Sequence, residues 1–292
     1  MESLLTLELS GCFDIEKILE FVENMGCLQE LKLGGIGIKE LPSSVEGLIG
    51  LTSLFVAYCD DLMCLPSAIC SLKSLESLDI SWCLKIDKLP KNLGNVKGLK
   101  MLKLSGTTIK ELPSSIEHLT SLTLLTINKC KNLVCLPNTI FSLKIGNSFD
   151  LAGCSKFDNL PENLGNVEGL EKLDLSGMAI KELPSSIEHL TSLTLLSRKN
   201  CKNLVCFPST ICCLKLLNSL DLSGCLKFDS LLENLGNVEG LEFLDLSGTS
   251  IKEVPSSIRQ SGRLPNMLEI IIPGGEIPKG FSPARFILKS PP

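Results

Sequence analysis

Cysteine is the residue type in this chain with the most evident chemical potential. Fourteen are present, and one position of a repeating pattern holds Cys12, Cys59, Cys83, Cys130, Cys154, Cys201 and Cys225. A second repeating position holds Cys64, Cys135 and Cys206. A zinc site would need a compact Cys/His cluster, and the sequence has no Cys-x-x-Cys pair. The regular spacing favours reduced, inward-facing structural cysteines over disulfides or a metal site.

Acidic side chains also recur, and they raise the question of acid–base catalysis. One outward position of the repeat holds Asp79, Asp150, Asp174, Asp221 and Asp245. Two carboxylates can act as acid and base only in a cleft that gives them different environments. We expect instead a row of solvated carboxylates, with a binding strip for a basic partner as the alternative. The two histidines, His118 and His189, lie at another position, and no Ser/His/Asp or Cys/His set can be assembled. The chain is therefore not expected to be an enzyme.

The single tyrosine and the single tryptophan of the chain, Tyr58 and Trp82, occupy the same position in neighbouring repeats, just before the cysteine. Phe55 lies in the same predicted strand as Tyr58. In other repeats that position holds Gly11, Gly153, Gly224, Lys129 or Asn200. Aromatic side chains grouped on an open face are typical of a binding hot spot. We interpret these three aromatic residues as a partner-binding anchor, with contact to a neighbouring domain, or no function, as alternatives.

These positions recur because the chain repeats itself every 71 residues, in units of 23, 24 and 24 residues. The segment from Lys110 to Leu125 returns unchanged from Lys181 to Leu196. Eleven units can be laid out, and they open at Leu4, Leu28, Leu51, Leu75, Leu99, Leu122, Gly146, Leu170, Leu193, Leu217 and Leu241. A fixed short period predicts a solenoid, in which each unit covers its neighbour.

Each unit opens with L-x-x-L-x-L, and this alternation predicts a short strand with its leucines inward. A glycine-containing turn follows, and then L-P-x-x-I/L, which predicts a short helix or 3₁₀ turn. Ser43, Ser114 and Ser185, each followed by Glu three residues later, match a capping box. The expected fold class is an α/β solenoid, a leucine-rich repeat horseshoe with a parallel concave sheet and short convex helices or 3₁₀ turns. We expect one sheet of eleven strands.

Three units depart from the pattern. Gly146 replaces the opening leucine of the seventh unit, and Leu232 replaces the proline of the tenth. Arg198 occupies an inward position of the ninth unit, where the sixth has Ile127. A buried unpaired guanidinium is costly. We therefore expect that strand to shift or the guanidinium to reach an edge, as drift in a duplicated array, with a functional arginine as the alternative.

Bulk composition excludes several classes of partner. The net charge is −5, which gives no support for binding to nucleic acid or an anionic membrane. No apolar run approaches the roughly 18 residues of a spanning helix. The start lacks a secretion signal, and no Asn-x-Ser/Thr sequon is present. With the cysteine usage, these features predict a reducing compartment, namely the cytoplasm and by extension the nucleus.

The rhythm stops after Ile258. The tail is rich in proline and carries two candidate strands, Leu268 to Ile272 and a second within Ala284 to Lys289. We expect two domains: a solenoid over residues 1–260, and a tail over residues 261–292 that is a cap or the start of a further β domain.

The sequence resembles one family in three segments: SGTTIKELPSSIEHLTSL from Ser105, CKNLVCLP from Cys130 and SGCLKFDSLLENLGN from Ser223. They resemble the leucine-rich region of plant intracellular immune receptors with TIR and NB-ARC domains, of the tobacco mosaic virus resistance protein type. The resemblance covers roughly residues 1–260. Ile271 to Pro278, with Phe281, resembles the start of the jelly-roll domain that follows those repeats. The chain is therefore expected to be a truncated form of such a receptor.

The resemblance implies that the repeats recognise a pathogen effector or a guarded host protein, and restrain the NB-ARC domain in a full-length receptor. No cofactor is expected, since no phosphate-binding G-x-x-x-x-G-K-[ST] loop is present. The expected partner-binding residues are outward-facing: Phe55, Tyr58, Asp79, Trp82, Met101, Lys103, Asp150, Asp174, Asp221, Phe243 and Asp245. One alternative is a cytosolic scaffold of the Ras-associated leucine-rich type, which usually has an even 23-residue period. A membrane receptor ectodomain is the other, and it should carry a leader and sequons.

Overall fold

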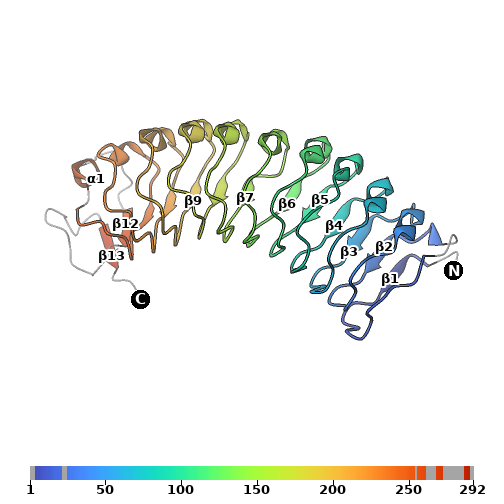
Figure 1. The fold of residues 1–292 in the computed structure, drawn as a ribbon. Coiled ribbons are helices and arrows are strands. Elements are labelled where there is room, and N and C mark those ends of the chain that lie inside the picture. Colours follow the sequence, from blue (N-terminus) through green and yellow to red (C-terminus); the bar gives the residue numbers. More distant parts are fainter. Residues whose placement is uncertain (1–3, 22–24, 254, 261–267, 272–285, 290–292) are drawn as a thin grey trace. The chain divides into compact units, whose positions relative to one another are not determined.

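The computed structural model describes residues 4–21, 25–253, 255–260, 268–271 and 286–289, and the chain divides into two compact units, Met1–Ile145 and Gly146–Pro292. In both units each repeat contributes one three-residue strand, and most repeats add one short helix. Within each unit the strands lie side by side along one face, and the helices lie along the opposite face (Figure 1). This is the architecture of a leucine-rich repeat solenoid.

The first unit holds one parallel sheet of six strands in sequence order. The central leucines align across it, as in the register of Leu31 with Leu54 and of Leu54 with Leu78. The strands are β1 (Thr6–Glu8), β2 (Glu30–Lys32), β3 (Ser53–Phe55), β4 (Ser77–Asp79), β5 (Met101–Lys103) and β6 (Leu124–Thr126). The 3₁₀ helices are η2 (Ser43–Gly47), η3 (Ser67–Ser71), η4 (Leu93–Asn95), η5 (Ser114–His118) and η6 (Asn138–Ser142).

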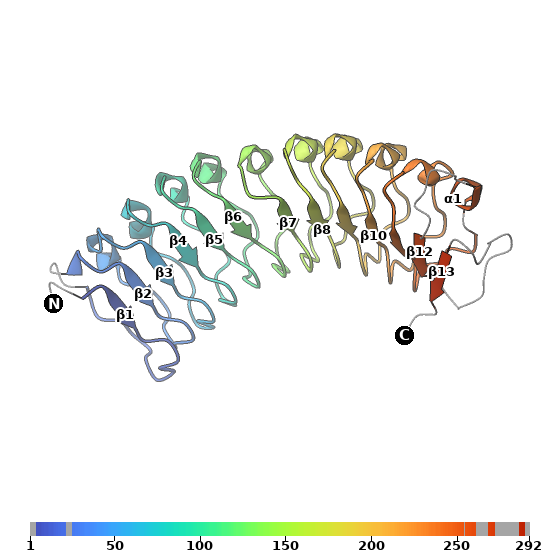
Figure 2. The ribbon, with the colours of Figure 1, turned by 180° about the vertical axis from the view of Figure 1, so that it is seen from behind.

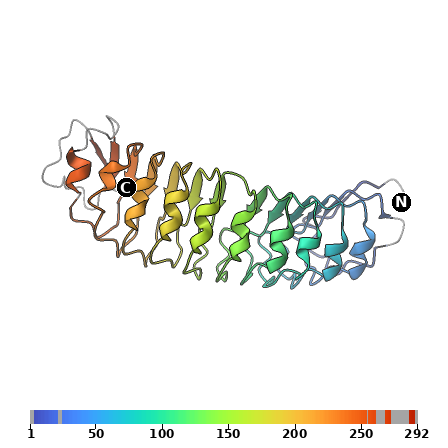
Figure 3. The same cartoon turned by 90° about the horizontal axis from the view of Figure 1, so that it is seen from above.

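The second unit holds a parallel sheet of seven strands. Five belong to repeats: β7 (Ser148–Asp150), β8 (Lys172–Asp174), β9 (Leu195–Ser197), β10 (Ser219–Asp221) and β11 (Phe243–Asp245). Two come from the tail, β12 (Leu268–Ile271) and β13 (Phe286–Lys289). The helices are η7 (Glu162–Asn166), η8 (Ser185–His189), η9 (Ser209–Cys213), η10 (Leu235–Asn237) and the α-helix α1 (Ser256–Gln260). The reverse and top views show the same two layers within each unit (Figures 2 and 3).

The inward positions form the predicted core. The middle leucines of the strands from β2 onward are at most 6% exposed, which confirms the prediction for Leu31, Leu54, Leu78, Leu102, Leu125, Leu173, Leu196, Leu220 and Leu244. Complete burial of a leucine side chain contributes roughly 1.5–3 kcal/mol relative to exposure. Because every repeat adds such a contribution, the stack is stable although each repeat strand has only three residues.

The expectation of one continuous sheet is wrong, because β1–β6 and β7–β13 form separate sheets. The division falls between Ile145 and Gly146, where glycine replaces the opening leucine. Gly146 has no side chain to bury, and its φ is 66°. Leu143, directly after η6, has an extended ψ of 144°, whereas the corresponding Leu119 after η5 has a ψ of 61°. The chain therefore enters β7 along a different backbone path.

The predicted capping boxes are also wrong. Ser43, Ser114 and Ser185 are the first residues of η2, η5 and η8, and no side-chain hydrogen bond caps these helices. In two of these repeats the second serine, Ser44 or Ser115, bonds to the preceding repeat instead. Ser115 Oγ accepts a hydrogen bond from the Gly94 amide at 3.1 Å and donates one to the Lys91 carbonyl at 2.7 Å. The pair thus joins neighbouring repeats.

The tail extends the repeat sheet of the second unit. The β12 strand pairs in parallel with β11, and β13 pairs in parallel with β12. Both strands lie within the segments that the sequence predicts. The segment 272–285, which contains most of the motif that resembles a jelly-roll start, lies outside the described residues. A separate β domain over residues 261–292 stays a prediction.

Candidate functional site

The turn that follows each strand passes through a left-handed backbone conformation at one fixed position. Glycine fills it in seven repeats, with φ between 68° and 78°, at Gly11, Gly35, Gly106, Gly153, Gly177, Gly224 and Gly248. The other four repeats have Tyr58, Trp82, Lys129 and Asn200 there, with φ between 57° and 63°. A side chain in this conformation costs roughly 1–2 kcal/mol, and a bulky aromatic is a clear outlier. Tyr58 and Trp82 therefore occupy positions where the backbone favours glycine.

Tyr58 and Trp82 form one parallel pair on the first unit. Their ring planes differ by 4°, and their centroids are 6.5 Å apart. Tyr58 is 59% exposed and Trp82 is half-buried. The Trp82 ring lies over the next turn, where a Cβ added to Gly106 would stand 2.6 Å from ring atoms Cδ2 and Cε3. The missing side chain of Gly106 leaves room for the indole.

Lys129 extends this row from the repeat beyond Gly106. Its Nζ lies 5.4 Å from the centroid of the Trp82 ring, within the range of a cation–π interaction. Sequence reasoning did not select Lys129, although it occupies the same turn position as the aromatic pair, and that shared position was the available signal. We call Tyr58, Trp82 and Lys129 together the aromatic rim.

Phe55 does not join the aromatic rim. It is the last residue of β3, is half-buried, and its ring lies against the backbone of Gly34 in the preceding repeat. The ring pairs found among the described residues do not include it. The structure therefore brings together two of the three predicted aromatic anchors and places the third on a neighbouring turn.

Charged and apolar groups lie beside Phe55 on the same sheet. Asp79 and Lys103 follow it in register, and Lys103 Nζ is 3.5 Å from Asp79 Oδ2. Asp79 is only 9% exposed, and its Oδ1 accepts a hydrogen bond from the Ser81 amide. Met101 pairs with Leu124, and both side chains are more than a third exposed. Leu124 is an outward apolar residue that sequence reasoning left out of the site.

The aspartates of the second unit have a structural role. In each of these aspartates, Oδ1 accepts a hydrogen bond of 2.8–2.9 Å from the backbone amide two residues later. The four are Asp150, Asp174, Asp221 and Asp245. Such a bond is an Asx turn, which ties the end of a strand to the turn that follows. Phe243 begins β11, which ends at Asp245, and is half-buried. The carboxylate row is therefore part of the turn chemistry as well as an acidic face.

Five ladder cysteines bond their own repeat to the one before it. The thiols of Cys59, Cys83, Cys130, Cys201 and Cys225 donate to carbonyl groups of the preceding repeat at 2.9–3.2 Å. Six of the seven ladder cysteines are buried, as predicted, whereas Cys12 is exposed, so the prediction is wrong for that residue. Cys64, Cys135 and Cys206 are also exposed. The ladder cysteines thus serve the packing of the repeats.

The buried arginine neither shifts its strand nor reaches an edge, contrary to expectation. The β9 strand keeps its register, and Arg198 is fully buried. Its Nη2 donates to the Ile180 carbonyl at 2.9 Å, while no geometric hydrogen bond of Nε or Nη1 is found among the described residues. The Cys201 thiol lies close enough to the guanidinium to interact with it. Burial lowers the pKa of Arg198. The neighbouring Cys225 thiol, followed by the charge of Arg198, lowers the pKa of Cys201 to about 6.

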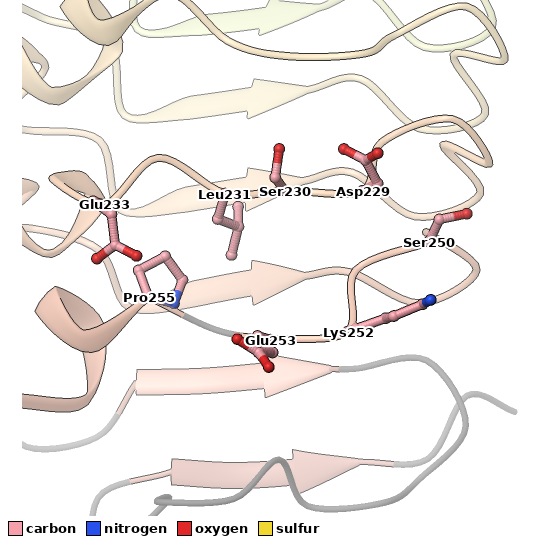
Figure 4. A pocket seen from close by; sticks show the side chains of 8 residues that line it. All are labelled: Asp229, Ser230, Leu231, Glu233, Ser250, Lys252, Glu253 and Pro255. Atoms are coloured by element: carbon pink, nitrogen blue, oxygen red, sulfur yellow. The ribbon is translucent and has the colours of Figure 1, made fainter.

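A shallow hollow of about 630 Å³ lies between the tenth and eleventh repeats (Figure 4). In the first unit the corresponding segments are joined by an ion pair of 3.0 Å between Lys110 and Asp87. The equivalent residues Lys252 and Asp229 line the hollow, and no ion pair is found between them in the described part of the chain. The lining is mostly polar and carries both charge signs, unlike a predominantly apolar ligand pocket. We therefore place the candidate site on the aromatic rim.

Comparisons with known proteins agree with this architecture. A family described as "Disease resistance protein RPS4B-like, leucine-rich repeats" matches residues 71–160. The chain is 39% identical to TMV resistance protein N of Nicotiana glutinosa over 170 residues, and 32% identical to disease resistance protein RPS6 of Arabidopsis thaliana over 179 residues. The matches cover 57% and 59% of this chain, but only 15% and 16% of those relatives. The repeats are related to the leucine-rich regions of plant disease resistance proteins.

Solved structures share the fold at low sequence identity. A TDR receptor aligns with 99% of this chain and 56% of its own at a TM-score of 0.64 and 18% identity. The functional domain of InlJ from Listeria monocytogenes, which includes a cysteine ladder, aligns with 88% of this chain and 51% of its own at a TM-score of 0.63 and 18% identity. In the described part of the chain, no helix is long and apolar enough to cross a membrane.

Proposed function

We propose that this chain is the protein-interaction module of a plant disease-resistance receptor, and that it recognises a pathogen effector or a guarded host protein. The relationship of the repeats to plant disease resistance proteins supports the biological setting. In this proposal the module acts in the cytoplasm and binds neither nucleic acid nor membrane, in line with a net charge of −5. It acts by binding, without a cofactor and without catalysis.

The observation that carries the proposal is the parallel pair of Tyr58 and Trp82 on left-handed turn positions. Glycine would fit both positions without strain, so two large aromatic groups there oppose local stability. Sites that trade stability for exposed aromatic surface are typical of function. Aromatic anchors dominate many protein interfaces, and truncating one commonly costs 2 kcal/mol or more.

The test is a pull-down with the purified chain as bait, from extracts of plant tissue with and without pathogen. Tyr58→Gly/Trp82→Gly removes both rings while suiting the backbone, and Asn200→Gly is the matched control at the same turn position. We expect the aromatic double variant to lose partners that the wild type and Asn200→Gly retain. If it keeps every partner while Asp221→Asn/Asp245→Asn loses them, the acidic strip is the site and the anchor is misplaced.

The second part of the proposal is restraint of an NB-ARC domain in a full-length receptor. It is supported only by the relationship to disease resistance proteins, because the chain matches 15% of TMV resistance protein N. We expect the chain to co-purify with a separately expressed NB-ARC domain of such a receptor. Failure to co-purify at micromolar concentrations, with both proteins folded, would remove autoinhibition from the proposal and leave partner recognition standing.

A further inference from the structure

We infer that the aromatic rim of the first unit binds an extended peptide segment of its partner, with apolar side chains at two alternate positions and an acidic side chain two residues beyond, on the Lys129 side. This inference rests on the proposed function, because it takes the partner to be a protein. It adds the conformation and the side-chain chemistry of the bound segment.

The spacing of the rim selects an extended chain. The centroids of Tyr58 and Trp82 are 6.5 Å apart. Alternate side chains of an extended strand lie about 6.6 Å apart on one face. In a polyproline II helix the same face returns only every third residue, after about 9 Å. An α-helix, about 10 Å wide, is held in a groove, whereas the rim is a single row of side chains.

The two rings offer flat apolar contact to such a segment. They are parallel within 4°, and Tyr58 keeps more than half of its surface exposed. The Trp82 ring packs against Gly106, and a Cβ at that position would displace the ring. The Trp82 ring is therefore presented in one orientation, so little of its side-chain freedom is lost when a partner binds. Aliphatic side chains at the two alternate positions would contact the exposed parts of the two rings.

The acidic position follows from the charge at the end of the rim. The lysines Lys85, Lys103 and Lys110 of the same unit are paired with aspartates at 2.6–3.5 Å. Lys129 and its exposed neighbour Lys131 have no carboxylate within 4.0 Å among the described residues. Lys129 Nζ lies over the Trp82 ring, 5.4 Å from its centroid, a separation close to one two-residue step of an extended segment. A carboxylate there would meet a cation that lacks an ionic partner.

The test is panning of a phage-displayed library of random 12-residue peptides on the full chain, with counter-selection on Tyr58→Gly/Trp82→Gly. We expect enriched peptides to share two apolar residues at i and i+2 and an acidic residue two positions from one of them. Trp82 is the only tryptophan, so the emission of the chain reports binding of the synthetic peptide directly.

The variants should rank in a defined order. Tyr58→Gly should weaken binding of the selected peptide at least tenfold, and Lys129→Gly should weaken it severalfold and reduce its dependence on salt. Asn200→Gly should leave binding unchanged. Thermal unfolding of each variant shows that it is folded, so a loss of binding reports the side chain alone.

Three outcomes would overturn the inference. They are a library that yields no enriched peptide, enriched peptides with apolar residues spaced at i and i+4, and peptides that bind Tyr58→Gly/Trp82→Gly as well as wild type. If the pull-down still captures proteins through these rings, the rim binds a folded or helical surface, and the proposed function stands. If peptides bind as expected but no protein is captured, the proposed function fails instead.

Discussion

The ring of Trp82 lies over Gly106, which occupies the same turn position one repeat later. Gly106 is required there for two separate reasons. Its φ of 74° suits glycine, and a Cβ would stand 2.6 Å from two atoms of the indole. The glycine turn of one repeat thus determines where the aromatic group of its neighbour can lie. This coupling can be measured as a stability difference.

We expect Gly106→Ala to reduce the free energy of unfolding by about 2 kcal/mol or more. The left-handed conformation accounts for roughly 1–2 kcal/mol of this, and displacement of the Trp82 ring for the remainder. Gly11→Ala is the control, because Gly11 has a φ of 77° and no heavy atom within 4 Å of its added Cβ. In a Trp82→Gly background the cost of Gly106→Ala should fall to that of the control. Urea unfolding measures all four variants, and equal costs in both backgrounds would show that the ring exerts no constraint.

We expect Trp82→Gly to be more stable than Trp82→Ala by about 1 kcal/mol, because only glycine adopts φ near 63° without strain. Met101 provides the opposite case, since it lies in β5, where glycine costs roughly 0.5–1 kcal/mol relative to alanine. Thermal unfolding of the two Gly/Ala pairs should therefore give differences of opposite sign. The same sign at both positions would mean that the turn relaxes when the indole is removed.

The repeat period predicted most of the fold. Because every unit buries its leucines against the next, the spacing alone placed eleven strands, and Leu54 or Leu220 could be assigned to the core without coordinates. The period could not predict where the hydrogen bonding between neighbouring strands is interrupted. Gly146 indicated an irregular repeat. One missing side chain does not reveal whether the next strand continues the same sheet or begins a new one. The division into two sheets needed the backbone angles after η6.

The candidate site was only partly predictable. The column shared by Tyr58 and Trp82 was visible in the sequence, whereas its left-handed conformation was signalled only by the glycines of other repeats. The Phe55 ring can lie against Gly34 because that residue has no side chain. No repeat pattern in the sequence indicated this contact. The aspartate row appeared solvated because spacing shows a face and not a hydrogen bond. The motif D-x-S-G was the available signal for the Asx turn.

The aspartate row yields its own prediction. Asp221 Oδ1 accepts the Ser223 amide at 2.9 Å and the Ser223 hydroxyl at 2.6 Å. We expect Asp221→Ala to lower the free energy of unfolding by about 1 kcal/mol, since it leaves the turn donors unpaired. Asp221→Asn keeps an acceptor oxygen and should cost less than half as much. If both variants are as stable as wild type by urea unfolding, the carboxylate is dispensable to the turn.

Arg198→Ile should stabilise the chain by around 1 kcal/mol or more. The guanidinium is fully buried, and two of its nitrogens form no geometric hydrogen bond with the described residues. Replacing such a group with an apolar side chain is commonly favourable. Ile127 occupies the equivalent position of the sixth repeat, so the substitution follows the chain's own pattern. Chemical denaturation at pH 7 measures the change. A loss of stability would mean that the Arg198 contacts with Ile180 and the ladder thiols outweigh its desolvation.

The last prediction concerns the pH dependence of the thiol beside that arginine. The pKa of Cys201 in the folded chain is about 6, below its ordinary value of 9.0, because the neighbouring Cys225 thiol and then the charge of Arg198 lower it. A lowered folded-state pKa contributes stability that is present above pH 9 and is lost as the pH falls through 6, so this contribution rises with pH between those limits. The stability difference between wild type and Cys201→Ser should therefore grow from pH 6 to pH 8.

The raised pKa of Cys225 affects stability only above the ordinary value of 9.0, outside this pH window. Arg198→Ile should reduce the growth. Urea midpoints at three pH values measure it, and parallel profiles for wild type and Cys201→Ser would show that Cys201 keeps its proton and donates to the Leu175 carbonyl throughout.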